Sequence, residues 1–160
     1  MIPWRGRLRI QTDNRRKLIK YGLLVRVVTE STSGYILNLE FCAGEGKKLQ
    51  EIIFKLLEHY FDQNYHVYQN NCYNYVKIAE ILLSRQVRIC GRIKVNKGLP
   101  PEMKNKSQSL KTGETTFRRK GEILLHSWRD NRVVNMISIM HDSTMVDVPR
   151  GNEDVKKKPI

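Results

Sequence analysis

The chain has 160 residues, of which 40% are hydrophobic and 28% are charged, and its formal net charge is +13. This length and composition suit one soluble domain with a hydrophobic core. We expect neither a membrane span nor a secretory leader, because no apolar run approaches membrane length and Met1 is soon followed by several arginines. Three widely spaced cysteines without a Cys-x-x-Cys pair disfavour a zinc site and a disulfide framework.

The positive charge is concentrated in two blocks. Residues 1–26 carry eight Lys and Arg against one acid, and residues 92–132 carry eleven against four, whereas residues 27–91 carry six against seven. Such blocks favour a polyanionic partner, because each phosphate that a cation neutralises releases a condensed counterion. Solvated surface also collects Lys and Arg, so nucleic-acid binding and a merely solvated surface both remain open at this point.

The first half of the chain predicts a hairpin, then helices alternating with strands. A buried strand over 23–29 and a second strand over 35–41 are joined by a turn rich in Ser, Thr and Gly. Apolar residues then recur at three- and four-residue spacings, which indicates an amphipathic helix over 47–61. Further along, the pattern predicts a strand, a helix and another strand, over 66–69, 73–83 and 87–95.

The second half reads as a loop followed by short strands. Residues 97–113 contain Gly98, Pro100 and Pro101 and predict an exposed loop. Three strands are expected over 115–118, 123–128 and 133–140, with turns at 120–121 and 130–131, and the charged end of the chain over 149–160 predicts a flexible tail. This order of elements indicates an α/β fold in which helices cover a mixed sheet.

Six segments, in this order, resemble motifs of the piggyBac transposase family: Met1–Arg7, Lys20–Gly22, Gly34–Asn38, Val67–Asn74, Gly91–Lys97 and Trp128–Val134. The resemblance implies a ribonuclease-H-like mixed sheet with flanking helices, truncated at both ends, plus a β-rich insertion. The corresponding domains are a partial core over 1–97, a loop and insertion over 98–148, and the tail over 149–160. The ancestral activity that it implies is cut-and-paste DNA transposition.

Members of that family use three Asp residues to hold catalytic Mg²⁺ ions, and the second of these positions is Asn70 here. By the resemblance, the first position would precede Met1 and the third would follow the tail. We therefore expect no catalytic residue, no metal site and no cofactor in this chain. Asn70 could bond the backbone of a turn or retain a metal contact. The turn is favoured because an amide supplies no charge to offset two divalent ions.

The candidate function is residual DNA binding by a transposase-derived, catalytically inactive protein of the nucleus. The candidate DNA-binding residues are the basic groups of the two blocks: Arg5, Arg7, Arg9, Arg15, Arg16, Lys17, Arg118, Arg119, Lys120, Arg129 and Arg132. If residues 5–9 formed a strand, the first three would project from one face. Trp128 could reach DNA, although packing inside the insertion is favoured. The alternatives are a remnant that pairs with an intact transposase or a chromatin protein, and a gene fragment without function.

Overall fold

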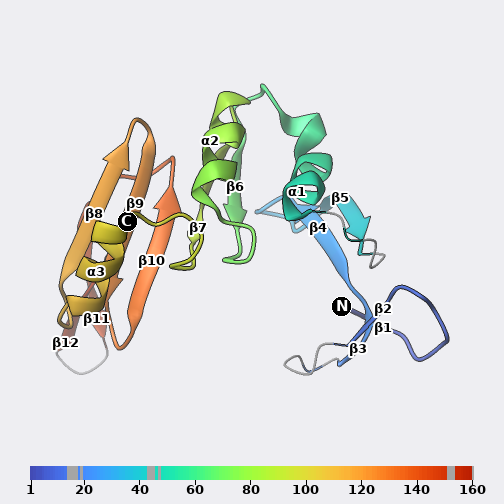
Figure 1. The fold of residues 1–160 in the computed structure, drawn as a ribbon, viewed down its shortest axis with the longest axis horizontal. Coiled ribbons are helices and arrows are strands. Elements are labelled where there is room, and N and C mark those ends of the chain that lie inside the picture. Colours follow the sequence, from blue (N-terminus) through green and yellow to red (C-terminus); the bar gives the residue numbers. More distant parts are fainter. Residues whose placement is uncertain (14–17, 19, 43–45, 47, 151–153, 160) are drawn as a thin grey trace. The chain divides into compact units, whose positions relative to one another are not determined.

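The protein was analysed as a computed structural model, which describes residues 1–13, 18, 20–42, 46, 48–150 and 154–159. The chain divides into two compact units, 1–59 and 60–160. Each unit is described by itself below (Figure 1). The division at residues 97 and 148 that the family resemblance implies stays a prediction. No helix in the described ranges has the length and apolar character needed to cross a membrane.

The first unit begins with a small antiparallel sheet of β1 (Ile2–Pro3), β3 (Tyr21–Leu23) and β2 (Gln11–Asp13), in the order β1-β3-β2. Because β1 and β2 both run antiparallel to β3, they are parallel to each other, and the chain must return between the end of β1 and the start of β2. Residues 4–10 form this connection and contain no strand. The structure thus lacks the strand over 5–9 on which Arg5, Arg7 and Arg9 would share one face.

The predicted hairpin is confirmed as β4 (Val25–Thr29) paired with β5 (Ile36–Phe41). The helix that follows is α1 (Leu49–Leu57), which continues as the short 3₁₀ helix η1 (Glu58–Tyr60). Asn38 on β5 donates from Nδ2 to the Leu56 carbonyl oxygen at 3.0 Å, and the Lys55 ammonium lies 2.7 Å from the Glu40 carboxylate. One face of the hairpin therefore meets α1, and the strand predicted as buried is only half-buried along β4.

The second unit contains a five-stranded mixed sheet in the order β6-β7-β10-β9-β8. Its strands are β6 (His66–Gln69), β7 (Arg88–Arg92), β8 (Thr115–Lys120), β9 (Ile123–Arg129) and β10 (Val133–Ser138). The pair β6/β7 is parallel and is connected through α2 (Val76–Ser84), whereas the remaining pairs are antiparallel. All five strands overlap strands that were predicted from the sequence, although β8 is mostly exposed whereas β9 is largely buried.

The core of this unit lies between the sheet and its helices. The fully buried side chains include Leu82 of α2, Ile89 of β7 and Ile137 of β10. Figure 1 shows α2 and the third helix, α3 (Pro101–Ser109), with the sheet that they cover. Lys120 of β8 lies 3.0 Å from Glu80 of α2, and Arg118 lies 2.8 Å from Glu102 of α3. These ion pairs place both helices on the same face of the sheet, since side chains two apart on a strand share a face.

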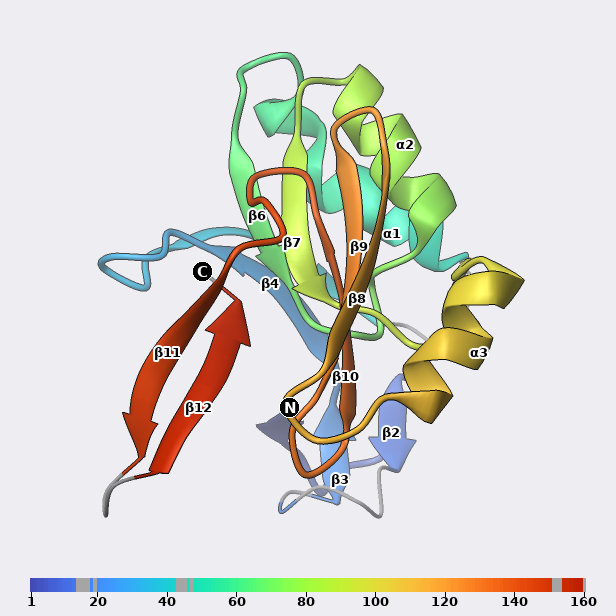
Figure 2. The same ribbon diagram turned by 90° about the vertical axis from the view of Figure 1, so that its left-hand side faces the viewer.

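Two predictions for the second half were wrong. Residues 101–109 form α3 rather than a loop. Pro101 stands in the first turn of the helix, where proline is tolerated. Only Met103 and Ser107 of this helix are buried, so its sequence shows little apolar periodicity. The predicted flexible tail contributes β12 (Asp154–Pro159), which pairs with β11 (Met145–Arg150) in the antiparallel ribbon that Figure 2 shows. The hydrogen bonds between the two strands join backbone groups, so β12 can form without an apolar pattern in its sequence. The charged sequence of this segment therefore gave no sign of a strand.

Candidate functional site

The position that corresponds to the family's second catalytic Asp lies directly after β6. Asn70 is exposed, and its Oδ1 accepts a hydrogen bond from the backbone N–H of Asn71 at 2.6 Å. Its own carbonyl oxygen accepts from the backbone N–H of Tyr73 at 3.0 Å, which closes a turn. Asn70 thus bonds the backbone of a turn, which is the role that the sequence analysis favours for it.

A second asparagine, which the sequence analysis did not single out, holds this turn against β7. Asn74 is fully buried, and its Nδ2 donates to the carbonyl oxygens of Gln69 at 3.2 Å and Arg92 at 2.8 Å. Gly91 lies beside it, and a Cβ at that position would collide with the Gln69 carbonyl oxygen and with the Asn74 amide. The backbones of β6 and β7 can approach this closely because residue 91 has no side chain.

The side chains around this turn do not fit a Mg²⁺ site of the kind that the family uses. The turn offers the amide of Asn70 and backbone carbonyl groups, whereas Mg²⁺ is held in proteins through one or more carboxylates. Among the described residues, no three His, Cys, Asp or Glu side chains gather closely enough to hold a metal ion.

The predicted basic residues of β8 already have partners, and they point to opposite faces. Arg118 and Lys120 form the ion pairs with α3 and α2 described above, whereas Arg119, between them, donates to the His141 carbonyl oxygen at 3.1 Å. Arg129 at the end of β9 donates to the Leu110 carbonyl oxygen at 2.9 Å. These side chains contribute to the packing of the second unit.

The N-terminal arginines present a different environment. Arg5, Arg7 and Arg9 are exposed, and within the described part of the chain no ion pair involves them. Arg132, at the turn after β9, is exposed as well. The other N-terminal candidates, Arg15, Arg16 and Lys17, lie outside the described residues. The candidate residues thus belong to two units, which are described separately.

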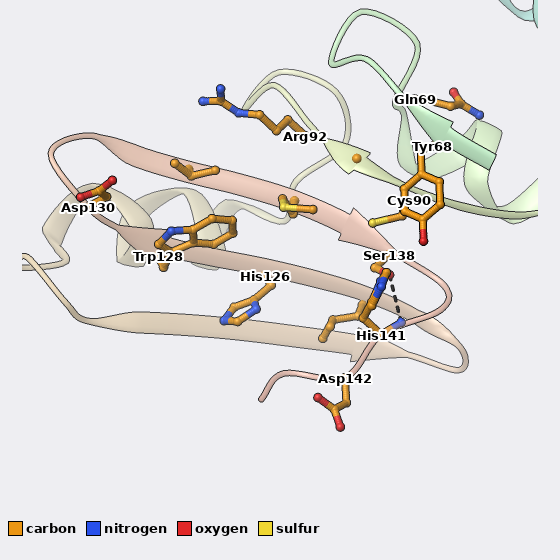
Figure 3. Close-up of a pocket in the computed structure, with 14 residues that line it drawn as sticks. Tyr68, Gln69, Cys90, Arg92, His126, Trp128, Asp130, Ser138, His141 and Asp142 are labelled. Atoms are coloured by element: carbon orange, nitrogen blue, oxygen red, sulfur yellow. Dashed lines mark hydrogen bonds between the residues drawn. The ribbon is translucent and has the colours of Figure 1, made fainter. Parts of the chain in front are cut away.

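A pocket of about 710 Å³ lies on the side of the five-stranded sheet away from α2 and α3, and sequence reasoning did not anticipate it (Figure 3). Tyr68, Arg92, His126 and Trp128 line it. Burial lowers the pKa of the His126 imidazole, and its Nε2 shares a hydrogen bond with the Thr115 hydroxyl. Burial therefore favours the neutral form of the ring.

Trp128 packs within this sheet, as favoured from the sequence, and it also lines the pocket. Its ring centroid lies 5.8 Å from that of His126, which in turn lies 6.3 Å from that of Phe117. Trp128 is half-buried, whereas Phe117 is 51% exposed. The three rings come from adjacent strands β8 and β9, a proximity that depends on strand register and could not be recognised from residue spacing alone.

Ser138 and His141 also line the pocket, and their hydrogen bonds stabilise the turn that follows β10. The Ser138 hydroxyl lies 2.8 Å from His141 Nδ1, and its oxygen accepts from the backbone N–H groups of Met140 and His141 at 3.1 Å each. An oxygen that already accepts two hydrogen bonds has no lone pair left for nucleophilic attack. The pair closes the turn after β10 and does not form a nucleophile with its base.

The mixed sheet with its helices and the strand-end position of Asn70 together define a ribonuclease-H-like domain of the DDE transposase class. A solved structure of similar fold is that of piggyBac transposase in a synaptic complex with hairpin DNA, with a TM-score of 0.80 and 21% identity. The chain belongs to the family described as transposase IS4, whose sequence profile matches residues 1–159.

The likeness to the piggyBac transposase structure confirms the resemblance and the fold class that were inferred from the six motifs. The match covers 89% of this chain but only 32% of the chain in that structure. The protein therefore spans about a third of the length of its structural relative. This likeness shows the fold of the chain and does not by itself assign to it an activity of the longer protein.

Proposed function

We propose that this protein is a transposable-element-derived, non-catalytic DNA-binding protein. The observation that carries the proposal is Asn70, which replaces an acidic metal ligand of the family by an amide whose oxygen is already bonded to the Asn71 N–H. A neutral amide does not provide the anionic oxygen on which two-metal phosphodiester chemistry depends. On this proposal the protein needs no cofactor and acts through binding alone, in the nucleus.

The exposed N-terminal arginines are the best-supported phosphate-binding groups. Arg5, Arg7 and Arg9 are available to a ligand, whereas the cations of β8 would first have to exchange an existing partner. Phosphate contacts of this kind position DNA without reading its sequence. The net charge of +13 supports the same partner, because it favours polyanions over other macromolecules.

A direct test is fluorescence anisotropy of a labelled DNA duplex with the purified chain, measured across a salt series with and without Mg²⁺. We expect an affinity that falls linearly in log[salt] and does not respond to Mg²⁺. Failure of the folded protein to bind duplex at low salt would refute duplex binding through these arginines. Mg²⁺-dependent strand cleavage, assayed on the same duplex in a gel, would refute the non-catalytic assignment.

One observation favours a second candidate, a protein-interaction role. The hairpin face that points away from α1 carries exposed apolar side chains: Val27, Leu37, Leu39 and Phe41 are each between 40% and 49% exposed. A contiguous apolar patch on a soluble protein commonly marks a protein-binding surface. A transposase or chromatin partner would bind there through apolar contacts, and its affinity would vary little with salt, unlike that for DNA.

A further inference from the structure

The five-stranded sheet of the second unit has one face that neither α2 nor α3 covers. Both helices lie on the face that carries Arg118 and Lys120, as their ion pairs with Glu102 and Glu80 show. Residues one position away on the same strand belong to the other face. We call this other face the open face and define it by the side chains that the argument uses: Tyr68, Arg92, Phe117, Arg119, His126 and Trp128.

Strand register places aromatic rings at both edges of the open face. Phe117, His126 and Trp128 form a continuous aromatic row over β8 and β9. Tyr68 lies on the opposite edge strand β6, three strand spacings from β9, which corresponds to roughly 14 Å. Tyr68 is 67% exposed and Phe117 is 51% exposed, so an aromatic ring faces solvent on each of the two edge strands. Figure 3 shows Tyr68 at the pocket.

Cations lie among these rings. Arg92 of β7 is exposed within the pocket. Arg119 shares its row of the sheet with Tyr68; one of its guanidinium nitrogens donates to the His141 carbonyl oxygen, and a guanidinium has further N–H groups for a phosphate. Two acids, Asp130 and Asp142, also line the pocket. The Asp142 carboxylate accepts from the Thr144 N–H at 2.8 Å and is attracted by Arg119, so part of its charge is already offset.

We propose that the open face binds single-stranded DNA, with bases stacked on Tyr68, Phe117 and Trp128 and phosphates held by Arg92 and Arg119. The proposal rests on the proposed DNA-binding function. It adds the open face as a second binding surface and single-stranded DNA as the ligand of that surface. Bases of a single strand have free π-faces for an aromatic platform, whereas duplex bases already stack on each other. The pocket volume of about 710 Å³ is in the range in which proteins enclose small planar groups.

The test uses one labelled 20-nucleotide DNA strand of mixed sequence, alone and annealed to its complement, at about 0.15 M salt. We expect the full chain to bind the single strand more tightly than the duplex. The variant Tyr68→Ala should weaken single-strand binding by about 5- to 150-fold, the equivalent of one base–aromatic stack, and leave duplex binding unchanged. Phe117→Ala should act in the same way.

The matched control is Tyr35→Ala, because Tyr35 is 69% exposed but belongs to the first unit. This variant should bind both probes like the unmodified chain. A second readout uses Trp4→Phe, which leaves Trp128 as the single tryptophan; saturating single strand should quench its fluorescence. Because the tyrosines and Phe117 are exposed, their removal should leave the fold intact, as circular dichroism would verify.

The outcomes separate this inference from the proposed function. If the duplex binds but Tyr68→Ala and Tyr35→Ala behave alike, or Trp128 fluorescence is unchanged, the open-face proposal is wrong and duplex binding stands. If neither probe binds, both proposals are wrong. Tighter binding of the same strand made as RNA would overturn the assignment of single-stranded DNA as the ligand.

Discussion

Asn74 donates a hydrogen bond from its buried amide to the Arg92 carbonyl oxygen at 2.8 Å, and this bond joins the turn after β6 to the end of β7. The same amide donates to Gln69. Asn74 therefore fixes the chain segment in which Asn70 lies, although it carries none of the family's catalytic chemistry. The position of Asn70 therefore depends on the buried hydrogen bonds by which Asn74 connects the ends of the parallel strands β6 and β7.

The first prediction concerns this contact. Asn74→Ala should lower the free energy of unfolding by about 1–3 kcal/mol, because it leaves buried carbonyl groups without their donor. Urea unfolding monitored by circular dichroism measures the effect. Asn105→Ala is a suitable control, since Asn105 is exposed on α3, and it should change the value by no more than about 0.5 kcal/mol. Equal effects of the two substitutions would argue against the structural role of Asn74.

The second prediction separates the turn role of Asn70 from a metal role. Asn70→Asp keeps an acceptor for the Asn71 N–H and should preserve stability, whereas Asn70→Ala should lose about 0.5–1.5 kcal/mol. Thermal unfolding at neutral pH, with and without Mg²⁺, measures both. A stabilisation of the unmodified protein by Mg²⁺ that Asn70→Ala abolishes would contradict the turn interpretation.

The third prediction is a pH dependence that arises at the β4–β5 turn. Hydrogen bonds from the Ser33 hydroxyl and from the backbone N–H groups of Ser33 and Thr32 lower the pKa of Glu30 from 4.5 to about 2. Because the pKa is depressed in the folded state, the stabilisation is complete above pH 4.5 and is lost progressively as the pH falls toward 2. Glu30→Gln should therefore be less stable than the parent at about pH 6, and the difference should shrink on acidification. Unfolding free energies from about pH 6 to about pH 3 provide the comparison.

The fourth prediction uses the different environments of the cysteines. Cys90 is buried, and burial raises the pKa of its thiol, whereas Cys72 is exposed. Since the thiolate is the reactive form, iodoacetamide should label Cys72 first and Cys90 last in the folded protein. Peptide mapping by mass spectrometry after timed labelling measures the order. In urea the difference should disappear, and early labelling of Cys90 in buffer would contradict its burial.

The fifth prediction compares two groups of cations in duplex binding. The triple variant with Arg5, Arg7 and Arg9 changed to Gln should reduce the slope of log affinity against log[salt] by up to about 2.7, or about 0.9 for each phosphate that is no longer neutralised. The double variant Arg118→Gln and Lys120→Gln should reduce it less, because these side chains pair with Glu102 and Glu80. A larger change of the slope in the double variant would indicate that duplex DNA binds at β8 and not at the N-terminal arginines.

Much of the fold could be predicted because its signals are local. The periodicity of Ile52, Ile53, Leu56 and Leu57 indicated α1, and the run of apolar residues at 123–125 indicated β9. The helix α3 was missed because its polar residues carry no apolar stripe, and its position is supported by Met103 and by the pairing of Glu102 with Arg118. Such tertiary contacts are not readable from residue spacing.

The candidate site was predictable only where a motif carried it. Asn70 was recognised because the surrounding segment resembles a family motif, and its turn role followed from the chemistry of Asn. The open face could not be foreseen, because Tyr68 and Trp128 are far apart in sequence and share a face only through the register of β6, β7, β10 and β9. The ion pairs that engage Arg118 and Lys120 likewise depend on where α2 and α3 pack.

The division of the chain near residue 59 affects how its unfolding is measured. Each compact unit contains one tryptophan, Trp4 in the first and Trp128 in the second. Units with separate cores can melt at different temperatures, so a single midpoint need not describe the whole chain. Fluorescence of Trp4→Phe and Trp128→Phe follows the two transitions one at a time. The natural tryptophans of this protein therefore suffice to measure whether the two units unfold together or separately.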